Sequence, residues 1–291
     1  MSITLRPATP GFGLEAQGID VSQPLTAEQV AILQQAWLDA DGILFFRNQN
    51  LTPEQHIAFS GVFGNVYSEG AKNNPALAHY YLEGHPEIYQ VSNKQIDGKP
   101  VGREDAGTFW HSDASWHAAP PTGSLLLARE LPTVGGDTMF ANMYRAYETL
   151  SEPMKQMLSG LEASHSILTA ALQTSYAKEY VGKLDQASQK QAVHPLIKVH
   201  PDSGRKVLFV NPGFTSHIIG IPTAESRAIL DFLFEHSTQP DNVYRHVWQL
   251  NDLLMWDNRC VMHYAVPNYK AHGIRYMHRT TIKAPEVAGA L

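Results

Sequence analysis

The pattern of apolar and polar positions predicts two helices and a buried strand near the start of the chain. Thr26 has Gln29 three residues later, which is the spacing of a capping box at a helix start. The apolar residues that follow recur at helical spacing: Val30, Leu33, Trp37 and Leu38. Residues 43–46 are all apolar and predict a short strand buried on both faces. Pro53 stands at the first position of a second predicted helix, which runs to about residues 63–64.

The rest of the chain is predicted to be mainly β with added helices. Strands are expected within 3–25 (one of them starting at 18–21) and at 88–91, 124–128, 138–140, 195–199, 207–210, 244–248, 253–256 and 274–282. Helical patterns cover 142–162, 165–192 and 222–236. Residues 65–86 read as a long loop, and Asp97-Gly98 as a hairpin turn. No repeat or linker is visible, so we expect a single domain over residues 1–291.

The aromatic, β-prone run Phe109-Trp110-His111-Ser112-Asp113 carries the strongest candidate chemistry. On a strand, side chains two residues apart point to the same face, so His111 and Asp113 would project together. Two histidines and one carboxylate form the facial triad that holds non-haem Fe(II). A tripeptide of this kind also occurs often by chance, on an exposed strand edge. The metal-site hypothesis therefore requires a further histidine from elsewhere in the chain.

Composition narrows the class of protein. The chain has 291 residues and a net charge of -6, and it contains no basic cluster of the kind that binds nucleic acid. No apolar run approaches the roughly 18 residues of a membrane span, and residues 1–13 lack the apolar segment of a secretory signal. Cys260 is the one cysteine, so no intrachain disulfide can form. These features predict a cytoplasmic protein.

Residues near the end of the chain could complete the metal site and bind an anion. His263 follows the apolar strand predicted at 253–256 and offers the third ligand. On the last predicted strand, Arg275 and Arg279 share one face. Two inward-facing guanidiniums are costly unless they meet anions, and Arg matches a carboxylate through two parallel hydrogen bonds. A dicarboxylic keto acid would need such an anchor and a neutral hydroxyl, for which Thr138 is the candidate.

With these residues in view, the chain resembles the taurine dioxygenase and phenoxyacetate-herbicide dioxygenase family of Fe(II)- and 2-oxoglutarate-dependent oxygenases. The matching segments are Trp110-His111-Ser112-Asp113, Gly135-Gly136-Asp137-Thr138, Trp256-Asp257-Asn258-Arg259, His263, and Arg275 with Arg279. The resemblance spans about residues 3–283 and implies a double-stranded β-helix, or jelly roll.

The resemblance also implies the roles of the site residues. Iron would be held by His111, Asp113 and His263, with 2-oxoglutarate and O₂ as co-substrates. Thr138 and Arg275 would bind 2-oxoglutarate, and Arg279 would lie near the keto acid or the substrate anion.

Departures from taurine dioxygenase bear on the substrate. Glu69 stands where that enzyme places a histidine against the sulfonate, which disfavours taurine. The segment between His263 and Arg275 is one residue longer, which concerns the shape of that loop. Asn93, after the strand at 88–91, is either a substrate contact or a strand-end cap. The expected substrate is a small organic anion with a larger apolar or amine-bearing body.

Two other classes of function fit part of the pattern. A non-catalytic jelly-roll binding protein could retain the residues as a vestige, and a zinc hydrolase could use the same three ligands. The intact ligand set and the paired arginines favour an oxygenase, which would hydroxylate its substrate with release of succinate and CO₂. Cleavage of a carbon–heteroatom bond would follow where the hydroxylated carbon bears the heteroatom. The expected partner is a small molecule, without nucleic acid or membrane; the oligomeric state stays open, with a homodimer or homotetramer considered.

Overall fold

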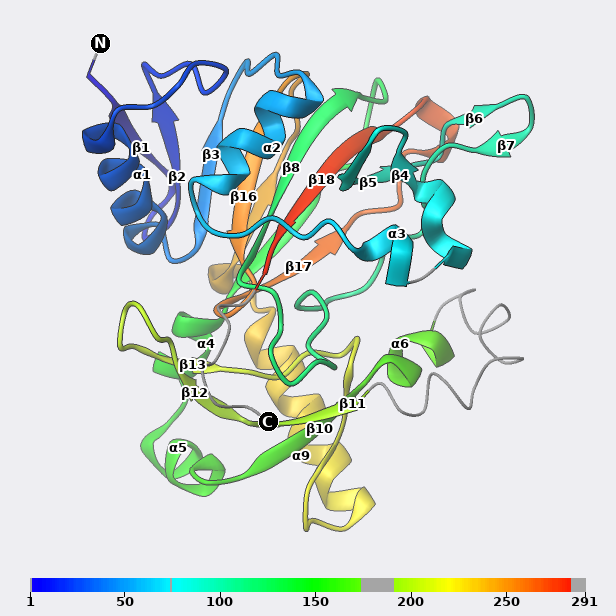
Figure 1. Cartoon of the computed structure of the whole chain (residues 1–291). Helices are drawn as coiled ribbons and strands as arrows, with labels where there is room; N and C mark the ends of the chain where they lie inside the picture. The colour runs from blue at the N-terminus through cyan, green and yellow to red at the C-terminus, as the bar shows by residue number, and fades with distance from the viewer. Residues whose placement is uncertain (1, 74, 174–190, 284–291) are drawn as a thin grey trace.

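The computed structural model describes residues 2–73, 75–173 and 191–283. An eight-stranded sheet is its largest layer (Figure 1), with the strand order β1-β2-β3-β16-β8-β18-β5-β4. The strands are β1 (Thr4–Thr9), β2 (Phe12–Gln17), β3 (Ile43–Phe46), β4 (Tyr81–Leu82), β5 (His85–Ser92), β8 (Gly123–Glu130), β16 (Leu253–Asp257) and β18 (Tyr276–Ile282). All neighbouring strands are antiparallel except β2 and β3.

The two faces of this sheet are buried in two different cores. Leu125 and Leu127 of β8 pack with Trp37 of α1 (Ala27–Asp39) and with Phe59 of α2 (Pro53–Gly61). Figure 1 shows α2 lying across the strands on this side. Leu126, between them, faces the second core. Side chains alternate along a strand, so a sheet covered on both faces requires the continuous apolar runs that the sequence contains.

A smaller sheet, in the order β15-β9-β17, lies on the second face. Its strands are β9 (Thr138–Asn142), β15 (Val243–His246) and β17 (Val261–Ala265). Phe140 of β9 packs 5.8 Å from the ring of Trp256 in the large sheet, measured between ring centroids. In the β9–β17 ladder, His263 stands opposite Phe140. His263 therefore lies between the two sheets.

The remaining elements form a second group, drawn below the large sheet in Figure 1. The strands are β10 (Glu162–Ser166), β11 (Gln191–Pro195), β14 (Thr215–Ile218) and the β12 (Ile197–Val199)–β13 (Lys206–Leu208) hairpin. The helices are α4 (Met143–Glu148), α5 (Glu152–Leu158), α6 (Ile167–Gln173) and α9 (Thr223–Ser237). Within the described ranges, no helix has the length and apolar character needed to cross a membrane.

Local signals in the sequence account for several element boundaries. Thr26 and Thr52 each form a complete capping box, with Gln29 and Gln55 respectively. The predicted turn at Asp97-Gly98 joins β6 (Gln95–Ile96) to β7 (Lys99–Pro100). Both turn residues have positive φ, 51° and 73°, as a two-residue hairpin of this type requires.

Outside the segment that carries His111 and Asp113, three predictions of secondary structure were wrong in whole or in part. Residues 18–21 are not a strand, because Gly18 takes a φ of +76° and the chain turns there. The predicted loop at 65–86 contains α3 (Gly70–Asn73), a 3₁₀ helix (Pro75–Tyr80) and β4. Among the described residues of the predicted helix at 165–192, α6 is helical, and the two ends belong to β10 and β11, which pair with each other. Residues 174–190 of that prediction lie outside the described residues.

Candidate metal centre and anion site

His111, Asp113 and His263 come together between the two sheets. All three are buried, and one possible ligand atom from each lies within 4.8 Å of the others. Oδ1 of Asp113 is 3.5 Å from Nε2 of His111 and 3.8 Å from Nε2 of His263. The structure thus groups the three residues that the sequence predicts as ligands.

The backbone that carries His111 and Asp113 is not the strand we predicted. His111 makes a single antiparallel bridge to His263, with backbone N···O distances of 3.0 and 2.8 Å. The chain then turns at residues 113–116, with Ala114 at a φ of +49°. Ser112 explains the turn, because its hydroxyl donates to the backbone carbonyls of Asn258 and Val261 at 2.6 and 3.0 Å. These bonds tie the segment to the turn before β17 and to the first residue of β17.

Hydrogen bonding fixes the tautomer of His111. Its Nδ1 lies 2.8 Å from the carbonyl oxygen of Phe109, which can only accept, so Nδ1 carries the hydrogen. In the neutral form of the ring, this places the lone pair on Nε2, the nitrogen that faces the carboxylate of Asp113. Two facing acceptors repel each other unless a cation lies between them. This arrangement therefore fits a metal ion bound through Nε2.

The charge states of the other two residues also suit a metal. Burial, with the charges of His111 and Arg279, holds the pKa of His263 well below its usual value and keeps the ring neutral. Burial opposes ionisation of Asp113, but the neighbouring positive charge of Arg279 leads the effects that outweigh it and hold its pKa well below the usual value. Neutral imidazoles and an ionised carboxylate are the forms in which these side chains bind metals.

Arg275 is a buried cation without a carboxylate partner among the described residues. Its exposed fraction is 2%, and burial lowers its pKa to about 10. Asp137, which influences it electrostatically, forms its own ion pair with Arg245 at 2.7 Å. A buried guanidinium without a counter-charge is costly, so this position favours the binding of an anion.

Thr138 adds a hydrogen-bond donor at the same place. Its Oγ1 lies 3.0 Å from Nε1 of Trp248 and 3.2 Å from Nη2 of Arg275, and both of those nitrogens only donate. The two lone pairs of the hydroxyl are thereby occupied, which leaves its hydrogen for an acceptor. Nε of Arg275 donates to the carbonyl of Gly136 at 2.8 Å and fixes the plane of the guanidinium. Thr138 and Arg275 can thus bind one carboxylate together.

Arg279 reaches the metal cluster from β18. Its Nη1 lies 3.2 and 3.4 Å from the two carboxylate oxygens of Asp113, and its guanidinium lies 5.2 Å from the ring centre of Tyr89. Its Nε is buried without a hydrogen-bond partner. His278, one residue earlier, points the other way and bonds the hydroxyl of Tyr276 at 2.8 Å. Both arginines therefore face the layer between the sheets, as the sequence predicts.

A second group of possible metal ligands is His200, Asp257 and Cys260. Nδ1 of His200 accepts from the backbone N–H groups of Asp202 and Ser203, so Nε2 carries the hydrogen and donates to Asp257 at 3.1 Å. Asp257 also binds the guanidinium of Arg259, at 2.6 Å from Nη2. Neither nitrogen of His200 has a free lone pair, so this group is a hydrogen-bonded ion-pair network and not a metal site.

The structure does not bring Glu69 and Asn93 to the cluster. Glu69 pairs with Lys283 at 2.7 Å and is partly exposed. Oδ1 of Asn93 accepts from the backbone N–H of Arg275 at 2.8 Å, and its Nδ2 donates to the carbonyl of Gly273 at 3.1 Å. Asn93 therefore fixes the start of β18, which is the cap alternative that the sequence left open.

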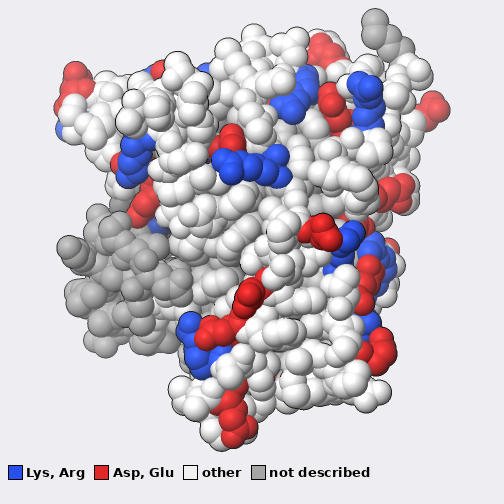
Figure 2. Space-filling view, turned by 180° about the vertical axis from the view of Figure 1, so that it is seen from behind, with Lys and Arg blue, Asp and Glu red and all other residues white. Residues whose placement is uncertain are grey.

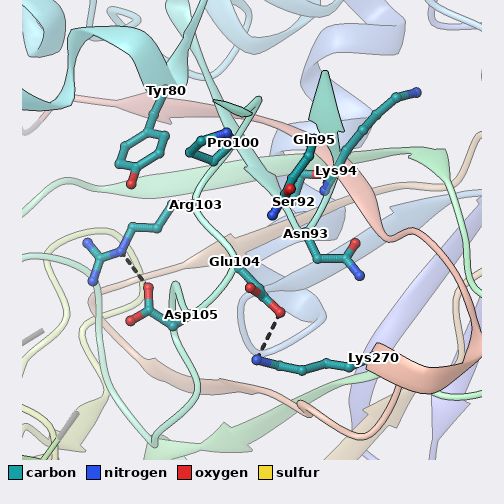
Figure 3. A pocket seen from close by; sticks show the side chains of 11 residues that line it. Tyr80, Ser92, Asn93, Lys94, Gln95, Pro100, Arg103, Glu104, Asp105 and Lys270 are labelled. Atoms are coloured by element: carbon teal, nitrogen blue, oxygen red, sulfur yellow. Dashed lines mark hydrogen bonds and ion pairs between the residues drawn. The ribbon is translucent and has the colours of Figure 1, made fainter. Parts of the chain in front are cut away.

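Asn93 also lines a polar cavity of about 370 Å³ (Figure 3). Figure 3 shows Arg103 and Asp105 turned toward each other, at 3.0 Å, and Lys270 turned toward Glu104, at 2.8 Å. These four charges are thus paired within the cavity wall, and Lys94 pairs with Glu130 outside it, at 2.7 Å. Asn93 itself reaches the anion site only indirectly, through the backbone of Arg275.

Sequence reasoning missed three polar residues of the site. Trp248 was predicted only as part of a strand, although its indole N–H reaches Thr138. Ser124 donates to Oδ2 of Asp113 at 2.8 Å, and Asn258 contacts the same network. Asn258 lies in a segment that supports the family resemblance, and that segment was the available signal. Ser124 sits in an apolar strand and gave no signal.

Comparison with known proteins agrees with this geometry. The sequence matches the family described as "Taurine catabolism dioxygenase TauD, TfdA family" over residues 4–281. It is 36% identical over 275 residues to the alpha-ketoglutarate-dependent 2,4-dichlorophenoxyacetate dioxygenase of Cupriavidus pinatubonensis, covering 90% of this chain and 92% of that protein.

Two crystal structures are similar over nearly the whole chain. One is a taurine dioxygenase from Burkholderia xenovorans, with a TM-score of 0.80, 33% identity, and coverage of 98% of this chain and 90% of that chain. The other is AAD-2 in complex with Mn(II) and N-oxalylglycine, with a TM-score of 0.79, 30% identity, and coverage of 98% and 99%.

Proposed function

The chain belongs to the TauD/TfdA family and is an Fe(II)- and 2-oxoglutarate-dependent dioxygenase, and from this premise we propose which residues perform the reaction and on what substrate. His111, Asp113 and His263 hold the iron. The observation that supports this most directly is that Nε2 of His111 and Nε2 of His263 both face Oδ1 of Asp113, at 3.5 and 3.8 Å. A metal ion can bind these three atoms together.

The co-substrate 2-oxoglutarate binds through its distal carboxylate to Arg275 and Thr138. The carboxylate provides the negative charge that Arg275 does not find among the described residues. It also accepts the hydrogen of the Thr138 hydroxyl, whose lone pairs are occupied by Trp248 and Arg275. When bound, iron with 2-oxoglutarate and O₂ supplies the oxidative decarboxylation that yields succinate and CO₂ and hydroxylates a substrate C–H bond. Burial of the cluster between the sheets excludes water from this chemistry.

The substrate is a small organic anion with an aromatic or other apolar body. Phe214 packs 5.8 Å from both His111 and Phe109, and 4.3 Å from Trp116, between ring centroids. Gly213 permits this close approach, because a Cβ there would lie 2.5 Å from the ring of Phe109. These rings form an apolar wall beside the cluster. Arg279, whose Nε has no partner, supplies the cation for the anionic group.

Glu69 no longer weighs against an anionic substrate. We expected its charge to repel such a substrate, but its carboxylate is paired with Lys283. The relative from C. pinatubonensis acts on 2,4-dichlorophenoxyacetate by its name. An aryloxyacetate therefore combines both requirements, an aromatic body and a carboxylate, better than taurine, which has no apolar body.

The proposal also covers the fold type, the domain organisation, the cellular location and the oligomeric state. The eight-stranded and three-stranded sheets that face each other are the two layers of a jelly roll, within one domain over residues 1–291. On the face drawn in Figure 2, basic and acidic side chains are interspersed, which suits a small-molecule substrate better than nucleic acid. A cytoplasmic location and a homodimer or homotetramer stay predictions.

Succinate release tests the proposed function. The protein is supplied with Fe(II), ascorbate, 2-oxoglutarate and O₂, and an aryloxyacetate, an alkyl sulfate and taurine are compared at equal concentrations. We expect succinate above the substrate-free rate with the aryloxyacetate and little with taurine. Efficient turnover of taurine, and none of the aryloxyacetate, would contradict the assigned substrate class.

A further inference from the structure

Ser124 binds the oxygen of Asp113 that faces away from the two histidines. Its hydroxyl lies 2.8 Å from Oδ2, whereas Oδ1 is the oxygen that lies near Nε2 of His111 and of His263. Ser124 is completely buried in β8, where three leucines follow it in the strand. A buried hydroxyl in such a strand needs a polar partner, and here that partner is a proposed metal ligand.

The direction of this hydrogen bond follows from the residues behind it. Oδ1 of Asn258 lies 2.9 Å from Nε1 of Trp256 and 3.4 Å from the backbone nitrogen of Asp113. Both nitrogens only donate, so the amide oxygen must face them and the amide nitrogen faces the other way. That nitrogen lies 3.4 Å from Oγ of Ser124 and donates to it. The hydrogen of Ser124 is then directed to Asp113.

Asn258 also fixes the backbone of the motif. Its carbonyl oxygen accepts from the hydroxyl of Ser112 at 2.6 Å, and its N–H donates to the carbonyl of Thr122 at 2.9 Å. Asn258 is 1% exposed. The amide that orients Ser124 is therefore held by the same contacts that hold the turn after His111.

We infer that Ser124 is a positioning residue, oriented by the Trp256–Asn258 pair, which keeps Oδ2 of Asp113 engaged so that Asp113 offers the metal one oxygen, Oδ1. This inference rests on the proposed role of Asp113 as a ligand. Arg279 contacts both oxygens and does not distinguish them by itself, at 3.2 and 3.4 Å. Ser124 touches Oδ2, and so it sets which oxygen remains for the metal.

Metal binding by the protein without 2-oxoglutarate tests the inference. Co(II) is titrated into metal-free wild type and Ser124→Ala, and its visible absorption bands report both affinity and coordination geometry. Outer partners of metal ligands typically contribute about 10–100-fold to metal affinity. We expect Ser124→Ala to bind Co(II) more weakly by that factor, because Asp113 loses an outer partner. We also expect altered absorption bands, because Oδ2 becomes free to bind the metal and changes its coordination geometry. Ser124→Thr, which keeps the hydroxyl, should restore the wild-type bands.

Ser60→Ala is the matched control. Ser60 is also a fully buried serine. Its hydroxyl donates to the carbonyl of His56 at 2.8 Å and lies 2.7 Å from the hydroxyl of Thr280. The affinity of the Ser60→Ala variant for Co(II) should stay within about twofold of the wild-type affinity. If Ser124→Ala does not fold, Asn258→Asp provides the second test, because a carboxylate facing Ser124 draws its hydrogen away from Asp113.

The outcomes separate this inference from the proposed function. Asp113→Ala should lose Co(II) binding more severely than Ser124→Ala. If Asp113→Ala loses binding while Ser124→Ala keeps both wild-type affinity and bands, the inference about Ser124 is overturned and the ligand assignment stands. If Asp113→Ala binds Co(II) as the wild type does, the ligand assignment itself fails, and the inference fails with it.

Discussion

At the scale of single residues, the site consists of buried polar groups that lack a hydrogen-bond partner or a counter-charge within the part of the chain that the structure describes. Arg275 is buried with no carboxylate beside it among the described residues, and Thr138 retains a hydrogen that no described group requires. Nε2 of His111 and Nε2 of His263 face one carboxylate oxygen of Asp113. In a folded interior such groups are costly, and they are retained where a ligand completes them.

Arg275→Ala should raise the KM for 2-oxoglutarate strongly. Truncating one partner of a buried charge pair costs on the order of 2–5 kcal/mol, which corresponds to roughly 30-fold or more in affinity. Without 2-oxoglutarate, the free energy of unfolding should not fall by a comparable amount, because the wild type carries an uncompensated buried cation. Steady-state succinate formation and urea unfolding measure the two effects.

Arg129→Ala is the control for this substitution. Arg129 is a partly buried arginine of β8, the strand that pairs with β18, and it bonds the carbonyl of Leu51 at 3.1 Å. Its KM for 2-oxoglutarate should match the wild type. An unchanged KM in Arg275→Ala would show that the anchor lies elsewhere, with Arg279 as the first residue to examine.

At the scale of elements, the sequence predicts best where the cause is local. The capping boxes at Thr26 and Thr52 and the turn at Asp97-Gly98 depend on neighbouring residues only, and all three are confirmed. The turn after Asp113 depends on hydrogen bonds from Ser112 to carbonyls of residues 258 and 261, which no local pattern encodes. A strand was therefore predicted there, although the grouping of the side chains was predicted correctly.

The same distinction applies to the site residues. The three ligand candidates and both arginines could be predicted because their residue types and order match a family pattern. Asn93 and Glu69 could not be placed, because their partners, the backbone of Arg275 and the side chain of Lys283, lie about 180 to 214 residues away in sequence. Trp248 and Ser124 were missed for a similar reason, since Trp248 bonds Thr138, 110 residues away, and Ser124 is oriented by Asn258, 134 residues away.

Thr52→Ala should lower the free energy of unfolding by about 1 kcal/mol without altering turnover. The substitution removes the side-chain acceptor for the N–H of Gln55 at the start of α2, and such caps typically contribute this amount. Thr223→Ala is the control, because α9 begins without a side-chain cap and Thr223 is exposed. Equal loss of stability in both variants, measured by urea unfolding, would contradict the role of the capping box.

At the scale of the whole molecule, several buried histidines are kept neutral by the fold. Burial, with nearby positive charges, lowers the pKa of His56 and His165 to about 3 and that of His194 and His278 to about 4. In the unfolded chain each would titrate near 6.5. Below that pH the unfolded state binds protons that the folded state excludes, so acid favours unfolding.

The free energy of unfolding of the metal-free protein should therefore fall as the pH drops from about 6.5 toward 4. Each fully buried histidine contributes about 1.4 kcal/mol per pH unit within this window. Urea unfolding at pH 7 and pH 5, in the presence of a chelator, measures the slope. His217→Ala should keep the slope because His217 is exposed. Equal free energies at the two pH values would refute this reading of the buried histidines.

Every other assigned role depends on the proposed iron site formed by His111, Asp113 and His263. Succinate formation from 2-oxoglutarate, measured in the wild type and in His263→Ala with Fe(II) or Zn(II), tests it most directly. We expect O₂-dependent succinate formation in the wild type with Fe(II), none with Zn(II), and loss of turnover in His263→Ala with either metal. Wild-type turnover by a folded His263→Ala variant, or equal activity with Zn(II), would contradict it.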